Sequence, residues 1–398
     1  MNSNAPIPSS STDRPDFSLV LGGPLFQLFR RAHLTGDALE MSNRRVIIAA
    51  SITWVPLLLL SLLSGHAFGD SVAIPFLQDV EAHVRFLIAL PILIAAELIV
   101  HRRLSPAVRQ FVERRIVIPE ELPKFQQAID STMRLRNSVW IELALIAVVY
   151  GVGMWMRDQL ALDKASWYAI PDGKVMRLTP AGYWQMLVSA PIFQFILLRW
   201  YFRFFLWFWF LFRVSRLNLH LIPIHTDRTG GLGFLGASTM AFAPVLIAQG
   251  AVLAGLIASR IFYAGQTLTN FKVQVVSFVG FFVIATLIPL TVFAPRLAES
   301  KRAGRGDAGR LASRYGRLFE EKWFRGGASD DELLGSGDIQ SLADLGNSMA
   351  VVQEMRLVPF GWRDVTRLVT ITAVPFLPLL LTIFSLEDVA TYLIKAIF

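Results

Sequence analysis

The sequence predicts an all-α, polytopic membrane protein. Hydrophobic residues make up 54% of its 398 residues and charged residues only 17%, whereas a soluble domain usually carries about 25% charged residues. The apolar residues gather in seven long stretches, each near the ~20 residues that a helix needs to cross ~30 Å of hydrocarbon. Segments rich in Lys and Arg separate these stretches, as is typical of a chain that crosses a bilayer repeatedly.

Seven membrane-spanning helices are expected, and the basic residues predict their orientation. The spans lie, in chain order, at 46–65, 83–100, 138–156, 186–212, 236–259, 273–294 and 367–385. If the N-terminus is cytoplasmic, the inner segments hold 27 of the 38 Lys and Arg residues and the outer segments hold 7. Since loops rich in Lys and Arg stay on the cytoplasmic side, we predict an N-in, C-out, multi-pass protein of the cell membrane, which is the inner membrane in a bacterium.

The spans divide the chain into four parts. A cytoplasmic tail with an interfacial helix is expected at 1–45, a six-helix membrane domain at 46–295, a cytoplasmic helical subdomain at 296–364, and the seventh membrane helix with an outer interfacial helix at 365–398. No helix breaker is apparent between Pro123 and Gly151. The third span is therefore expected to begin as one long helix in the cytoplasm.

The subdomain at 296–364 has a polarised charge pattern. Its first part, 296–325, is basic, with nine Lys and Arg against four acidic residues, and the following stretch, 326–347, is acidic. Apolar residues repeat at helical spacing within the basic part, which predicts an amphipathic helix. We expect a helical hairpin whose basic helix either contacts anionic lipid or pairs with the acidic stretch.

Four charged residues fall inside the expected spans: Glu97, Glu142, Arg199 and Arg203. Arg199 lies about 21 Å along the helix from Arg213 at its cytoplasmic end, which makes it the deepest charge. A charge near the bilayer centre costs at least ~2.5 kcal/mol, so it usually faces a partner or water. The four residues predict a polar lining for an anion or proton path. The alternative is structural: an ion pair or an aromatic contact holds Arg199, while the others reach the interface.

A glycine-rich loop precedes the fifth span. Its candidate site residues are His225, Asp227, Arg228, Gly230, Gly231 and Gly233. Free amides before a helix, with Arg228 beside them, suit an anion such as phosphate, so the loop is a candidate anion site or gate. His225 and Asp227, with His220 or His101, form an alternative metal-binding set. In a third interpretation, Asp227 or Thr229 caps the helix and the glycines permit a tight turn.

Composition excludes several functions. The chain has no cysteine, which removes disulfides, thiolate metal sites and cysteine nucleophiles. Its pI near 10 follows from basic cytoplasmic loops, so we expect no nucleic-acid partner. The common nucleotide-binding and hydrolase motifs are missing, and no cofactor is indicated.

The leading hypothesis is a channel or transporter for a small ion or an anionic solute. One alternative is a membrane enzyme that acts on a phosphate-bearing substrate at the inner leaflet. The other is a membrane sensor or scaffold that uses 296–364 to bind partners. Small residues along the fifth span permit close helix contact and homo-oligomers; they are Ala243, Gly250, Ala254 and Gly255.

Overall fold

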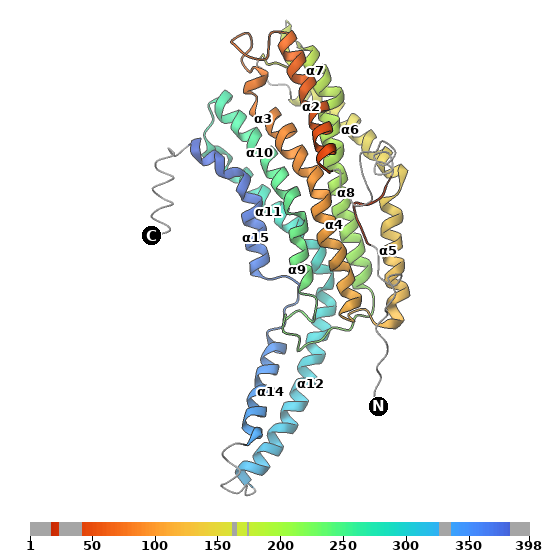
Figure 1. Ribbon diagram of the computed structural model, residues 1–398. Helices are drawn as coiled ribbons and strands as arrows, with labels where there is room; N and C mark the ends of the chain where they lie inside the picture. Colours follow the sequence, from red (N-terminus) through yellow and green to blue (C-terminus); the bar gives the residue numbers. More distant parts are fainter. Residues whose placement is uncertain (1–16, 24–41, 161–164, 173–174, 326–335, 383–398) are drawn as a thin grey trace.

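The computed structural model describes residues 17–23, 42–160, 165–172, 175–325 and 336–382, without the side chains of 42, 152–160, 172 and 175. It confirms an all-α polytopic architecture: a long helical bundle from one end of which a helical hairpin, α12 with α14, projects (Figure 1). The two interfacial helices expected within 1–45 and 386–398 lie outside the described residues. The cytoplasmic location of the N-terminus stays a prediction.

The described residues contain six helical runs long and apolar enough to cross a membrane. These are Asn43–Leu63, Val80–Glu113, Pro180–Ser215, Phe234–Ala264, Leu268–Arg325 and Trp362–Thr382. They coincide with six of the seven expected spans. The third expected span falls on a seventh helix, Val139–Leu160, whose described apolar part, Val139–Gly151, is shorter.

The elements follow one another with short connections. The α-helices are α2 (Ser42–Leu63), α3 (Val80–His83), α4 (Leu90–Glu113), α5 (Leu122–Arg136), α6 (Val139–Leu160), α7 (Pro180–Trp184), α8 (Ala190–Ser215), α9 (Phe234–Ser238), α10 (Ala243–Ala264), α11 (Lys272–Leu287), α12 (Ala294–Glu320), α14 (Gly337–Gln353) and α15 (Trp362–Ala373). The 3-10 segments are η2 (Phe76–Gln78), η4 (Pro119–Glu121), η6 (Thr239–Phe242), η7 (Leu268–Phe271), η8 (Ile288–Phe293) and η10 (Val374–Thr382), and the π segments are η3 (Val84–Ala89), η5 (Gln185–Ser189) and η9 (Glu321–Arg325). An antiparallel pair, β1 (Ala169–Asp172) and β2 (Val175–Leu178), lies near the bundle end opposite the hairpin, with Ala169 opposite Leu178.

Prolines explain where the membrane helices depart from α geometry. Pro91 and Pro191 each follow a π segment, η3 and η5, by two residues. A proline has no N–H and its ring clashes with the carbonyl four residues back, so a locally wider turn relieves the conflict. Pro56 lies inside α2 without such a turn. Because it cannot bond to the Ile52 carbonyl, Trp184 Nε1 donates to that oxygen instead, at 3.2 Å.

The expected continuous helix from Pro123 to Gly151 is wrong, because the chain breaks at Asn137. Helix α5 ends at Arg136 with Asn137 as its C-cap, and α6 begins at Val139. Asn and Ser side chains compete for backbone hydrogen bonds and favour such boundaries, so Asn137 and Ser138 were the overlooked signal. In consequence α5 packs along α8 instead of extending α6.

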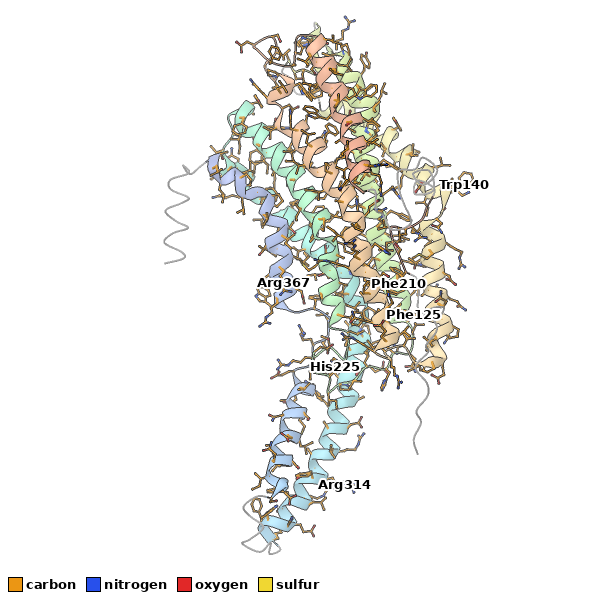
Figure 2. All side chains as sticks on the ribbon, viewed as in Figure 1. Phe125, Trp140, Phe210, His225, Arg314 and Arg367 are labelled. Atoms are coloured by element: carbon orange, nitrogen blue, oxygen red, sulfur yellow. The ribbon has the colours of Figure 1, made fainter. Side chains whose placement is uncertain are left out.

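An aromatic core fills the half of the bundle nearest the hairpin. Phe125 of α5 and Phe210 of α8 lie side by side, with ring centroids 6.0 Å apart (Figure 2). The segment 17–23 inserts beside them: Phe17 is fully buried and its ring lies 4.7 Å from that of Phe210. Arg136 donates to the Ser18 carbonyl and fixes this segment against α5. The polar composition of the N-terminal tail did not predict this insertion.

The small residues of the fifth span serve contacts within the chain. A Cβ atom at Gly250 would lie 2.9 Å from Pro375, and one at Gly255 would lie 3.1 Å from Val84. Ala243 and Ala254 are buried as well. The close helix contact expected from these residues is therefore made by α10 with its own neighbours in the bundle.

Candidate functional site

Glu97 of α4 is the centre of a buried group of charges. Arg203 Nη2 of α8 donates to Glu97 Oε1 at 2.7 Å, and Arg45 Nη2 of α2 donates to Glu97 Oε2. All three residues are less than a tenth exposed. Arg203 also stacks over the Trp200 ring at 4.6 Å. Buried charges persist only when they are paired and hydrogen-bonded, and Glu97 meets this condition with both oxygens.

Arg199 and Glu142 extend this group toward α6. Arg199 Nη2 lies 3.7 Å from Glu142 Oε1, and its Nη1 lies 4.0 Å from Glu97 Oε1. Both distances exceed the range of a hydrogen bond. Three helices, α4, α6 and α8, thus bring together the four charged residues predicted from the sequence, and Arg45 of α2 joins them. We name these five residues, Arg45, Glu97, Glu142, Arg199 and Arg203, the charge cluster.

Arg45 is a site residue that the sequence analysis missed. This basic residue before the first span was not among the candidate site residues. The overlooked signal was its position in the first turn of a helix, directly before the apolar run of α2 that starts at Val46. A basic side chain there lies at the same level as polar residues on neighbouring helices.

The charge cluster forms a single layer across the bundle. Measured along the helices, Arg45 lies about 27 Å from Leu63, Glu97 about 26 Å from Val80, and Arg199 about 28 Å from Pro180. The loops hold these three far ends together. Trp167 Nε1 donates to Asp79, and Thr179 Oγ1 donates to the Trp167 carbonyl, which joins the ends at Val80 and Pro180. The Phe76 amide donates to the His66 carbonyl, which joins the loop after Leu63 to the same end. The layer is therefore about one hydrocarbon thickness from that end of the bundle.

Helix α5 covers α8 beyond the charge cluster and presents a polar outer surface. Its buried residues Phe125, Ala128, Ile129 and Thr132 lie on one face. The opposite face exposes Lys124, Gln126, Gln127, Asp130 and Arg134. Such a helix is suited to water, not to lipid tails. The aromatic half of α8 therefore packs against a helix that faces water.

Asp227 organises the glycine-rich loop from within. Its Oδ1 accepts hydrogen bonds from the Thr229 and Gly231 amides, and its Oδ2 accepts one from the Gly233 amide. Burial alone would raise the pKa of Asp227, but these three amides outweigh it and the pKa is lowered. The amides that would have held an exogenous anion thus already bind a carboxylate of the chain.

The loop also joins the bundle to the segment after α14. Arg228 pairs with Glu354 at 2.8 Å, the Arg356 amide donates to the Arg228 carbonyl at 2.7 Å, and Arg356 Nη2 donates to the Asp227 carbonyl. Gly230 has a φ of +65°, and a Cβ there would lie 3.2 Å from both Leu221 and Met355. His225 lies at this junction between bundle and hairpin (Figure 2).

His225 and Asp227 are adjacent, with Nδ1 and Oδ1 3.0 Å apart. Among the described residues, no group of three His, Asp or Glu side chains is placed to hold a metal ion, whereas a zinc site needs three or four protein ligands. The geometry therefore gives no support to the alternative in which His220 or His101 completes a metal site. The loop lies beyond Ser215, some 18 Å along α8 from Arg203.

The fold and composition define the class of the chain: an integral membrane protein with several membrane-compatible helices. No protein family, curated protein or solved structure matches it.

Proposed function

We propose that this chain is a membrane transport protein, a channel or transporter, that binds a small anion at Arg199 of the charge cluster. The observation that supports the proposal most strongly is the uneven pairing of the cluster. Counted over the five described residues of the cluster alone, three guanidinium groups face two carboxylates, an excess of one positive charge.

The excess charge is located at Arg199. Both Glu97 oxygens are engaged by Arg45 and Arg203. In the part of the chain that the structure describes, Arg199 makes no hydrogen bond within 3.5 Å, and its carboxylate neighbours lie at 3.7 and 4.0 Å. A guanidinium offers five N–H donors in a planar fork that suits a carboxylate or phosphate. A partly buried, weakly paired arginine is thus a favourable position for an anion.

The layer geometry supports a position at the inner mouth of the bundle instead of the bilayer centre. A hydrocarbon layer of ~30 Å, measured from the end that carries Leu63, Val80 and Pro180, ends at the level of the charge cluster. Arg102 and Arg103 follow Glu97 within two turns, and the polar outer face of α5 begins beyond it. We place the cluster at the cytoplasmic surface of the membrane. There an anion reaches it from the cytoplasm, on the side of the segments rich in Lys and Arg.

Flux measurements test the proposal. Purified protein is reconstituted in liposomes, and the flux of chloride, acetate and phosphate is measured one anion at a time. We expect Arg199→Leu to reduce the flux of the transported anion at least tenfold. Arg260→Leu is the matched control. Arg260 is exposed near the C-terminal end of α10, which lies at the same end of the bundle as Val80, away from the charge cluster. Equal flux in wild type and Arg199→Leu, or no flux of any small anion in wild type, would overturn the proposal.

The membrane-enzyme alternative has less support. Its catalytic residues would be His225, Asp227 and Arg228, but Asp227 binds the loop amides and Arg228 binds Glu354. These residues connect the loop to the segment after α14. The observation favours a mechanical role for the loop, as a joint between the bundle and the hairpin.

A further inference from the structure

The helices α12 and α14 form a two-helix hairpin. It projects away from the membrane-compatible helices (Figure 1). Its first turns are anchored, because Ser300 donates to the Leu221 carbonyl and Gly304 packs against Pro223. Beyond that point the other described elements leave it largely uncovered: of the seventeen residues of α14, only Val352 is buried. Two helices without a third layer leave one side of each helix without a packing partner.

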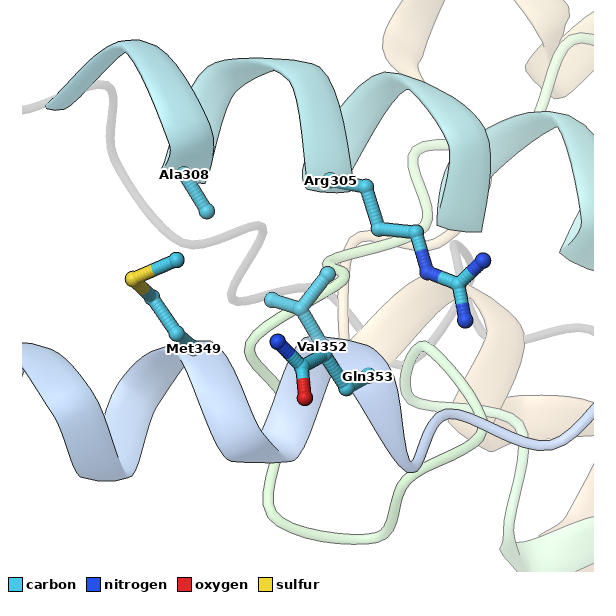
Figure 3. A pocket seen from close by; sticks show the side chains of 5 residues that line it. All are labelled: Arg305, Ala308, Met349, Val352 and Gln353. Atoms are coloured by element: carbon cyan, nitrogen blue, oxygen red, sulfur yellow. The ribbon is translucent and has the colours of Figure 1, made fainter. Parts of the chain in front are cut away.

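Contact between the two helices is incomplete even at the anchored end. Arg305 and Ala308 of α12 face Met349, Val352 and Gln353 of α14 across an open space (Figure 3). The cavity between them measures about 380 Å³. The hairpin thus resembles one side of a larger assembly, in which additional helices would cover its apolar residues.

Three glycines in the hairpin lie on open surface in the described part of the chain. A Cβ atom at Gly309, Gly316 or Gly346 would meet no described atom within 4 Å. Glycine is among the poorest helix formers, and these three have φ angles that other residues adopt equally well. The glycines of α10, by contrast, are packed against neighbours. A glycine on a helix surface permits a partner backbone to approach closely.

One face of α14 is suited to such contact. Ile339, Ala343, Gly346 and Ala350 are spaced by four, three and four residues, which places them on one side of the helix, and all four are exposed. Asp344 is the only charged residue from Ile339 to Gln353. A helix that faces water alone usually carries charges around its exposed surface, so this uncharged face favours a packed state.

Charge and orientation favour a second copy of the chain as the partner. Residues 294–325 carry nine basic and four acidic residues, whereas α14 carries two acidic and no basic residues. Of these two, Asp338 pairs with Lys322 of the same hairpin at 2.7 Å, so the attraction from α14 depends on Asp344. Two copies in one bilayer point their hairpins the same way. The outgoing α12 of one copy then lies antiparallel to the returning α14 of the other, and their charges are opposite. Pairing of α12 with α12 would be parallel and would bring like charges together.

We propose that the α12–α14 hairpins of two copies associate as an antiparallel four-helix bundle around a two-fold axis along the hairpin. The Ile339–Ala350 face of α14 lies toward that axis. Because the hairpin points away from the bundle, this arrangement replaces the expectation that its basic helix lies on anionic lipid of the same membrane.

Cross-linking in native membranes tests the proposal directly, since the chain has no cysteine. Ala343→Cys lies on the proposed face, and Ser348→Cys lies about 140° around the helix on the other side. With a homobifunctional maleimide of ~10 Å span, we expect Ala343→Cys to form a covalent dimer of twice the chain mass and Ser348→Cys to remain at least fivefold less cross-linked. Equal cross-linking of both, none of either, or a product that contains a different protein would overturn the proposal.

A glycine substitution separates assembly from folding. Gly346→Leu raises helix propensity, so the monomer should unfold at the same or a higher temperature. The added side chain blocks close approach, and we expect it to reduce the Ala343→Cys dimer at least fivefold. Ser341→Leu, on the opposite flank, is the matched control and should leave the dimer intact. Undiminished dimer in Gly346→Leu would contradict the proposed interface. Both experiments measure dimer formation alone, so their outcome does not depend on whether the protein transports anions.

Discussion

At the scale of the residue, Glu97 holds the charge cluster together. Its carboxylate binds the guanidinium groups of Arg45 and Arg203, and all three side chains are buried. A buried ion pair adds little net stability compared with apolar residues, but removing one partner leaves an uncompensated buried charge, which costs about 3–5 kcal/mol. The cost of removing Glu97 therefore comes from Arg45 and Arg203, which stay buried without their counter-charge.

We expect Glu97→Gln to lower the free energy of unfolding by about 3–5 kcal/mol, because Arg45 and Arg203 lose their counter-charge. Unfolding in mixed micelles measures this value. Glu299→Gln is the control, since Glu299 forms an exposed pair with Arg296 and such pairs contribute at most about 1 kcal/mol. Similar losses in both variants would show that the cluster is as accessible to water as a surface pair.

The sequence identified four of the five members of this cluster because charged residues stand out within apolar runs. The depth of Arg199 in the membrane stays a prediction. Its distance from Arg213 favours a position deep in the bilayer, whereas the proposed layer places about the last 21 Å of α8, which α5 covers, outside the hydrocarbon. A helix segment covered by a neighbouring helix and one covered by lipid have the same apolar composition, so the sequence of α8 does not distinguish them.

At the scale of the element, hydropathy was sufficient to locate six of the membrane-compatible helices, since each is apolar along nearly its whole length. Features that depend on tertiary contacts could not be predicted from hydropathy. The insertion of 17–23 requires a crevice between α5 and α8 that no local pattern encodes. The break at Asn137 was encoded locally but was outweighed by the apolar periodicity on both sides.

Pro56 and Trp184 give a prediction at this scale. Trp184→Phe removes the donor to the Ile52 carbonyl, and an unsatisfied carbonyl costs about 1–3 kcal/mol. Pro56→Ala restores a backbone N–H for the same oxygen, so the double variant should recover at least half of the loss. A double-mutant cycle on unfolding free energies measures the coupling. Additive effects would mean that the indole and the proline act independently.

At the scale of the whole molecule, the account depends on orientation. In sealed cells, a membrane-impermeant maleimide should label Ser71→Cys and spare Ser313→Cys; both positions are exposed, one at each end of the molecule. The reason is the excess of Lys and Arg on the hairpin side. After permeabilisation both should react equally. Labelling of Ser313→Cys in sealed cells would place the hairpin and the charge cluster at the outer surface.

The flux of one small anion through Glu142→Gln tests the central claim most directly. Glu142 is the carboxylate that competes with an anion for Arg199. Its neutralisation leaves Arg199 with more uncompensated charge, so the account predicts an increase in flux of about threefold or more, corresponding to roughly 0.6 kcal/mol, with an unfolding temperature near that of wild type. A fall in flux in a protein that remains folded would contradict the assignment of Arg199 as the anion site.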